Sequence, residues 1–386
     1  MLLAFIVLNI FPVKINFANG PIILLLVLSL YGMIKNFRIK HLNHFLFILS
    51  IPLMVYSLGM INTENLEYGT KFIMRNIYFL VFPFILYNQA KESINSDLIY
   101  KFYLGALAVV NLYLIYLFIY YFNLGERFYK IVTFDIYHST YLGLYNLFGF
   151  WIVLIKKELV PKTRLRILLL VFFIACAIMT SSRIIFILSI LSLISSALLN
   201  YKLKLKFLIS MIAILVLTMI FILVIPSINE KFMQILELKS FSFNKDNYLS
   251  VSSRLAKLEA ANTIIKNNLF FGTGTGDLMD ELVKVYKDMK FTMGYKYRYN
   301  PHNQFLDNIS RNGIILGSLA LASIYVWPLI LSFKRRSYLL GALVLLMIGV
   351  SMTESILNVQ RGISFCAFFL TILVFDVYSK SDSKIG

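Results

Sequence analysis

Residues that form disulfides or bind metals are scarce in this chain of 386 residues, which has 2 cysteines, 4 histidines and 19 acidic residues. Both cysteines, Cys176 and Cys366, lie in apolar stretches, where we expect neither a disulfide framework nor a thiolate metal site. The acidic residues form no cluster typical of a divalent-cation site, and the histidines form no metal motif. We therefore predict that any catalysis by this chain proceeds without a metal ion.

Apolar residues, by contrast, are abundant: 59% of the chain is hydrophobic, 15% is charged, and the mean hydropathy is +0.77. Many of the apolar stretches approach the ~20 residues that a helix needs to cross a bilayer. The sequence thus predicts an all-α polytopic membrane protein with about twelve transmembrane helices. The predicted spans are 2–14, 20–34, 45–61, 71–88, 98–122, 141–155, 165–180, 184–199, 207–226, 313–331, 338–353 and 363–379.

The 37 lysines and arginines give a net charge of +18 and gather in alternate loops between these spans. The positive-inside rule makes those loops cytoplasmic, and both termini with them. Because the cations are dispersed over short loops, we do not expect nucleic-acid binding. The basic loops lie around residues 35–40, 156–166, 202–206 and 334–336.

This topology predicts a single membrane domain that carries one large extracytoplasmic segment. Residues 1–226 hold the first nine spans, residues 227–312 form a helical extracytoplasmic insert, and residues 313–379 hold the last three spans. The insert is too long to be a mere connector.

His302 stands at the end of the insert, directly before apolar sequence. Asn300 is a good helix cap and Pro301 fits a first helical position, so we expect a helix with His302 in its first turn. A neutral imidazole beside an apolar face can accept a proton near pH 7. Asn303, the next residue, is a further candidate for the substrate site. The alternative is a histidine that only caps or packs.

Several cations are predicted at the extracytoplasmic ends of spans or in the insert. Arg183 lies at a junction of two spans, where it reaches either an anion or water. Lys71 and Arg75 share one helix face, which suggests an anion site unless Glu64 or Glu67 pairs with them. Arg254 lies in the first part of an amphipathic helix of the insert, and simple solvation is the alternative reading of it.

Four more residues are predicted to lie on the same extracytoplasmic side. His138 and Tyr141 stand at the mouth of the sixth span, and Glu354 and Arg361 stand in the last external loop. Each of them alone is compatible with interfacial anchoring or with a salt bridge.

The glycines of "FFGTGTGDL" do not predict a nucleotide site, because no strand precedes them and the loop faces away from the cytoplasm. We expect Gly272, Gly274 and Gly276 to form a flexible turn, and Asp277 to cap the next helix.

Four stretches of the chain, taken in order, resemble the O-antigen ligase/polymerase superfamily of bacterial envelope glycosyltransferases. They are "YHSTYLGLY", "MTSSRIIF", "SRLAKLEAANTIIKNNLFFGTGTGD" with "NPHNQFLDNISRNGIILG", and "TESILNVQRGISFCAFF". The resemblance covers roughly residues 130–375, and the "PHNQFL" segment is its most specific part. Where relatives often have His-Pro, this chain has His138-Ser139.

The resemblance implies a fold related to the type C glycosyltransferases and a site on the periplasmic face of the bacterial inner membrane. It implies a glycan donor carried on undecaprenyl pyrophosphate and no cofactor. A ligase uses lipid A core as acceptor, whereas a polymerase uses a second carrier-linked glycan. His302 would be the catalytic residue, and Arg183 and Arg254 would hold the pyrophosphate; Lys71 and Arg75 are added to that site from local chemistry alone.

The competing class is a transporter, such as a lipid-glycan flippase. Transporters tend to place charged residues near the middle of the bilayer and to show paired repeats. In this sequence the charges gather toward one predicted face and no repeat is visible, which favours an enzyme.

Overall fold

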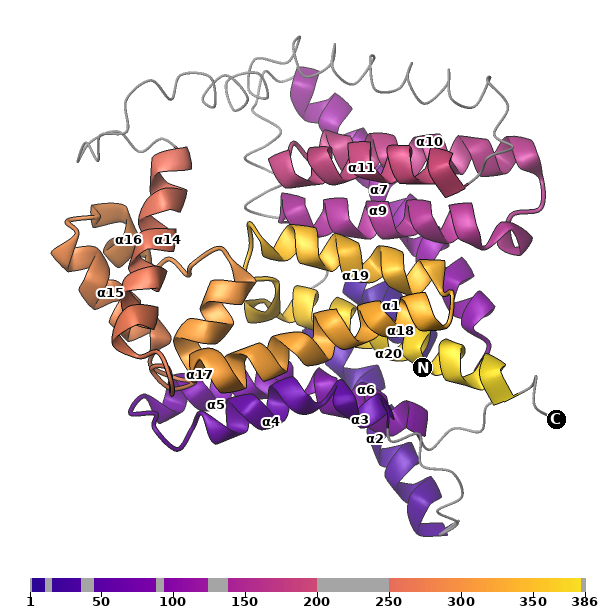
Figure 1. The fold of residues 1–386 in the computed structure, drawn as a ribbon. Helices are drawn as coiled ribbons and strands as arrows, with labels where there is room; N and C mark the ends of the chain where they lie inside the picture. The colour runs from indigo at the N-terminus through magenta and orange to yellow at the C-terminus, as the bar shows by residue number, and fades with distance from the viewer. Residues whose placement is uncertain are drawn as a thin grey trace. The chain divides into compact units, whose positions relative to one another are not determined.

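The computed structural model describes residues 2–10, 16–35, 45–87, 94–123, 138–199 and 250–382 (Figure 1). These residues form helices and connecting turns without a strand, which confirms the predicted all-α class. The predicted span at 207–226 and the first part of the insert, up to residue 249, lie outside the described residues.

The chain divides into two compact units. The first comprises Met1–Ile22 and Asn95–Glu237, and the second comprises Ile23–Ile94 and Leu238–Gly386. Helix α2 (Asn16–Lys35) contributes residues to both.

The first unit is built around a helix that is buried along almost its whole length. Residues 139–154 of that helix, α9, are all buried among its neighbours, and α9, α10 and α11 lie side by side (Figure 1). Asn111 and Asn146 join two of these helices by a pair of buried amide hydrogen bonds of 2.6 and 3.2 Å. Such polar contacts hold membrane helices together where apolar burial provides no driving force. The helices of this unit are α1 (Leu2–Ile10), α7 (Ser96–Asn123), α9 (Ser139–Ile155), η3 (Lys157–Leu159), α10 (Thr163–Met179) and α11 (Arg183–Leu199).

The second unit contains the residues around His302. Its helices are α3 (Phe45–Ile48), α4 (Ile51–Leu58), α5 (Leu66–Asn76), α6 (Tyr78–Tyr87), α14 (Ser250–Asn267), α15 (Leu278–Asp288), α16 (Thr292–Tyr297), α17 (Gln304–Leu321), the π-helix η4 (Ala322–Val326), α18 (Trp327–Lys334), α19 (Tyr338–Ser351), η5 (Ile356–Asn358) and α20 (Gln360–Asp382).

Among the described residues, four helices are long and apolar enough to cross a membrane by length and composition. They are Leu66–Leu86, Ser96–Tyr120, Gln304–Lys334 and Gln360–Ser379, and they overlap the predicted spans 71–88, 98–122, 313–331 and 363–379. Shorter apolar helices coincide with several other predicted spans. The count of about twelve stays a prediction.

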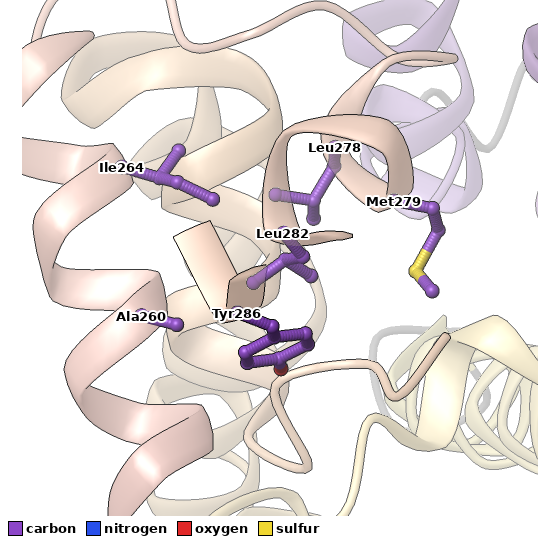
Figure 2. Packing of buried hydrophobic residues seen from close by; sticks show 6 residues of the cluster. All are labelled: Ala260, Ile264, Leu278, Met279, Leu282 and Tyr286. Carbon is purple, nitrogen blue, oxygen red and sulfur yellow. The ribbon is translucent and has the colours of Figure 1, made fainter. Parts of the chain in front are cut away.

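The described part of the insert has a hydrophobic core of its own, formed where α14 meets α15. Figure 2 shows Ala260 and Ile264 of α14 facing Leu278, Leu282 and Tyr286 of α15. Leu278 and Leu282 have no exposed surface, and burying a leucine side chain contributes roughly 1.5–3 kcal/mol. The insert is therefore held by packing, which gives α14 a fixed face toward the residues that precede α17.

The glycine-rich turn after α14 packs against a break inside α17. Gly313 breaks that helix with a left-handed φ of 72°, and a Cβ placed on it would overlap the backbone carbonyl of Phe270. The N–H of Gly274 donates to Arg311 O (3.0 Å), and that of Ile314 donates to Leu269 O (2.8 Å). The expected flexible turn is thus a closely packed one, bonded to α17 on both sides of the break.

Asp277 stands at the cap position of α15, as predicted, but its carboxylate does not bond to that helix. Its two oxygens accept hydrogen bonds from the N–H groups of Glu64 (2.8 Å) and Asn65 (2.7 Å), directly before α5. The expected capping bond is therefore corrected: this carboxylate ties the insert to the start of α5.

We expect Gly313→Ala to destabilise the protein by about 1–3 kcal/mol, because alanine is strained at this φ and the obstructing atoms belong to the backbone. Thermal unfolding of the purified protein in detergent measures the effect. Gly105→Ala, in α7, is the matched control, since a Cβ there meets no atom within 4 Å. Equal melting temperatures for the two variants would show that the break in α17 is not needed.

Candidate active site

The segment around His302 is a turn, and α17 begins only after it. Asn300 Oδ1 accepts a hydrogen bond from the N–H of His302 (3.0 Å), and His302 has a left-handed φ of 49°. Asn303 then caps the helix, because its Oδ1 accepts from the N–H groups of Phe305 and Leu306. The prediction that Asn300 caps the helix is therefore wrong, and His302 precedes the helix instead of lying in its first turn. The left-handed residue turns the chain away from the helix that Asn300 would have started.

His302 bonds to a buried carboxylate. Its Nδ1 lies 3.0 Å from Oε2 of Glu354, which is 7% exposed and follows α19. When this carboxylate is ionised it can only accept, and a neutral His302 then carries its hydrogen on Nδ1 and its lone pair on Nε2. This contact brings together two predicted site residues that are 52 positions apart in the sequence. It fixes the ring orientation that a general base requires.

A lysine that the sequence analysis did not select lies beside this pair. Lys257 of α14 is 6% exposed, and its Nζ lies 4.1 Å from the ring centroid of Tyr299. The Tyr299 ring lies edge-on to the His302 ring, with their centroids 6.4 Å apart. Burial lowers the pKa of Lys257, the negative charge of Glu354 opposes this effect, and the positive charge of Arg254 adds to it; together they bring the pKa to about 8. His302, Glu354, Lys257 and Arg254 thus form one electrostatic group.

Asn303 and Arg361 are two further residues that the sequence predicts for the substrate site. The side-chain amide of Asn303 donates to Met352 O (3.2 Å) while its carbonyl caps α17, so the residue links α17 to the turn after α19. Arg361 is half-buried in the first turn of α20. A role for either residue with substrate stays a prediction.

Lys71 and Arg75 are both exposed on α5, and Lys71 forms an ion pair with Glu67 one turn earlier. This pairing is the alternative that the sequence left open for the two cations. The function proposed below does not draw on them.

His138, Tyr141 and Arg183 belong to the first unit, where they gather at one end of its helices. The rings of His138 and Tyr141 pack with their centroids 4.9 Å apart, and Tyr141 is buried. Thr140 and Ser182 share a hydrogen bond of 3.2 Å, which brings the start of α9 to the residue before Arg183. Arg183 itself opens α11 and is half-buried. Its assignment to pyrophosphate rests on the sequence resemblance alone.

Residues 168–321 match the family model described as O-antigen ligase. This segment of the chain therefore resembles an O-antigen ligase domain. The match confirms the predicted O-antigen ligase/polymerase superfamily, and it supports the prediction of a membrane protein. No curated protein is similar enough to the chain to count as a match.

The O-antigen ligase domain includes Arg183, Arg254, Lys257 and His302, whereas Glu354 lies beyond its end. The partner of the candidate base therefore comes from outside the matched segment. Residue spacing did not predict this pairing, because the two residues meet only when the loop after α19 folds against the start of α17.

Hydrogen bonds from the first turns of α17 hold this helix against the loop that follows Glu354. Gln304 Oε1 accepts from the N–H of Leu357 (2.7 Å), and the amide of Asn358 donates to Asp307 Oδ2 (2.6 Å). Gln304 and Asp307 have no exposed surface. Buried polar contacts of this kind restrain the loop more firmly than surface contacts do. They hold η5 against the start of α17, close to His302.

Arg311 is a buried cation of the same domain that the sequence analysis also missed. It has no exposed surface; its Nε donates to Asp307 Oδ1 (3.2 Å), and an Nη donates to Thr275 O (2.5 Å). Its guanidinium lies 4.1 Å from the ring centroid of Phe72. In the sequence, the neighbouring residues "SRNG" indicate a polar turn, and the spacing of these residues does not predict that Arg311 is buried.

Among the described residues, no three histidine, cysteine, aspartate or glutamate side chains gather where they could hold a metal ion. Metal independence stays a prediction.

Proposed function

We propose that this chain is a glycosyltransferase that moves a glycan from undecaprenyl pyrophosphate to lipid A core, without a metal and with inversion at the anomeric carbon. The observation that carries this proposal is the 3.0 Å contact between His302 Nδ1 and the buried carboxylate of Glu354, within a cationic group that includes Arg254. The match of residues 168–321 to the O-antigen ligase family supports the class of donor and acceptor.

In the proposed reaction, a hydroxyl of the acceptor attacks the anomeric carbon of the donor glycan. His302 Nε2 takes the hydroxyl proton, while Glu354 holds the imidazole and stabilises the imidazolium that forms. The bond between the anomeric carbon and the phosphate oxygen breaks, and undecaprenyl pyrophosphate leaves with the electron pair. Arg254 stabilises the charge that develops on the leaving group, since a guanidinium matches the geometry of phosphate oxygens.

We place this site on the extracytoplasmic side of the inner membrane, with both termini in the cytoplasm. The distribution of basic loops supports this orientation. Reporter fusions at residues 160 and 335 should be cytoplasmic, and a fusion at residue 290 should be external. A cytoplasmic signal at residue 290 would place the site on the wrong side for the lipid-linked donor.

The role of His302 can be tested by substitution. His302→Ala should lose about 10²–10⁴-fold in the transfer rate, the usual contribution of a general base. His302→Gln should be nearly as inactive, because an amide cannot accept the proton productively. The wild-type rate should fall in acid as the imidazolium forms. Glu354→Gln should lose less, since its carbonyl still accepts from Nδ1.

These rates are measured by transfer of a carrier-linked glycan to lipid A core by the purified protein, with membrane abundance as the control for folding. If His302→Gln keeps substantial activity and the wild-type profile lacks the acid limb, His302 orients a substrate instead of taking a proton.

The acceptor is decided by deletion of the gene and gel analysis of lipopolysaccharide. Complete loss of glycan on the lipid A core is expected for a ligase. Retention of caps with a single repeat unit would show instead that the chain is a polymerase that joins carrier-linked units. Unchanged lipopolysaccharide with a lost capsule would point to another surface glycan.

A further inference from the structure

Lys257 is a buried cation that the mechanism above does not use. Its side chain is 6% exposed, whereas lysine is almost never buried to this degree unless it is paired. It lies on α14 three positions after Arg254, so the two side chains share one face of the helix. The sequence of α14 therefore directs two cations toward the same place.

The surroundings of Lys257 lead directly to the candidate base. The Nζ lies over the ring of Tyr299 at 4.1 Å, which is the geometry of a cation–π contact. Tyr299 in turn contacts His302, and Glu354 acts on both His302 and Lys257. An aromatic ring positions the ammonium group without neutralising it.

The positive charges around Lys257 exceed the negative ones, which favours the binding of an anion. Arg254 is a second positive charge, and the negative charge of Glu354 is shared with His302. Burial and the like charge of Arg254 disfavour the protonated lysine, which is why its pKa falls to about 8. A phosphate group bound beside Arg254 would favour the protonated lysine, because its negative charge offsets both the burial of Lys257 and its repulsion from Arg254.

We propose that Lys257 is a second cation of the pyrophosphate site, donating to a phosphate oxygen of the donor beside Arg254 and held in place by the ring of Tyr299. This inference rests on the proposed function for the identity of the donor. It assigns Lys257 to binding of the donor and of the leaving group, close to His302.

The pH dependence of binding follows from the protonation of Lys257. Bound phosphate favours the ammonium form, so the pKa of Lys257 is higher in the complex than in the free protein. Affinity should be constant below about pH 8 and should fall up to tenfold per pH unit above it. The other charged or titratable groups around Lys257 are Arg254, Glu354 and Tyr299, and Glu354 is bonded to His302. Burial raises the pKa of Tyr299 above its usual 10.

The test is binding of undecaprenyl pyrophosphate without a glycan to the full-length protein in nanodiscs, measured by calorimetry from pH 7 to 9.5. Lys257→Gln should bind about 10- to 100-fold more weakly at pH 7, as expected for loss of a charge-assisted hydrogen bond, and its affinity should not change with pH. Lys257→Arg should bind at pH 7 within a few fold of wild type and stay constant above pH 8, because arginine does not deprotonate there.

Lys266→Gln is the matched control, since Lys266 is an exposed lysine in the last turn of the same helix. It should bind like the wild type and show the same decline above pH 8. Tyr299→Leu should weaken binding more than Tyr299→Phe, which keeps the ring under the ammonium group.

Wild-type affinity for Lys257→Gln would overturn the proposal, and so would a wild type whose affinity stays constant to pH 9.5. If Lys257→Gln does not fold in a thermal-unfolding assay, the proposal is decided by comparing wild type with Lys257→Arg. The measured quantity is then the change of affinity with pH above pH 8. Glycan transfer is assayed separately. Lys257-dependent binding without transfer would reject the proposed function only, whereas transfer with Lys257-independent binding would reject this inference only.

Discussion

The buried guanidinium of Arg311 is the constraint on which the second unit depends. Removing a charge from water carries a large penalty unless hydrogen bonds and an opposite charge replace the solvent. Arg311 meets most of this demand through Nε and one Nη, with Asp307 from its own helix, the backbone of Thr275 from the glycine-rich turn and the ring of Phe72 from α5, while the other Nη has no hydrogen-bond partner in the described part of the chain. Three segments far apart in the sequence must therefore assemble together.

This assembly determines where the candidate active site lies. Once Arg311 and Gly313 fix the glycine-rich turn against α17, the start of that helix faces the loop that carries Glu354, and the bonds of Gln304 and Asp307 hold that loop. His302 then needs only a short turn to reach its carboxylate. The candidate site is thus held by buried polar contacts, in a chain whose composition is mostly apolar.

The sequence was sufficient for the all-α class, and it singled out His302 and Glu354, which the structure brings into contact. Composition predicted membrane helices, and the residues around His302 and Arg254 carried the family resemblance. The start of α17 was predicted wrongly, because Asn300-Pro301 has the form of a helix cap and the left-handed backbone of His302 is invisible in a pattern of residue types. Lys257 and Arg311 were missed for a related reason. Each looks like an ordinary surface cation until tertiary packing buries it.

The left-handed backbone of His302 also bears on how this position can vary in evolution. Glycine accepts such a φ without strain, and asparagine and aspartate accept it more readily than most residues, whereas β-branched residues do not. At this one residue, the fold therefore requires a left-handed backbone, whereas the proposed reaction requires an imidazole. A lineage that no longer needed the reaction could drift here to glycine or asparagine and keep the same architecture. Such a substitution in an otherwise intact chain would identify a relative that keeps the fold but has lost the proposed activity.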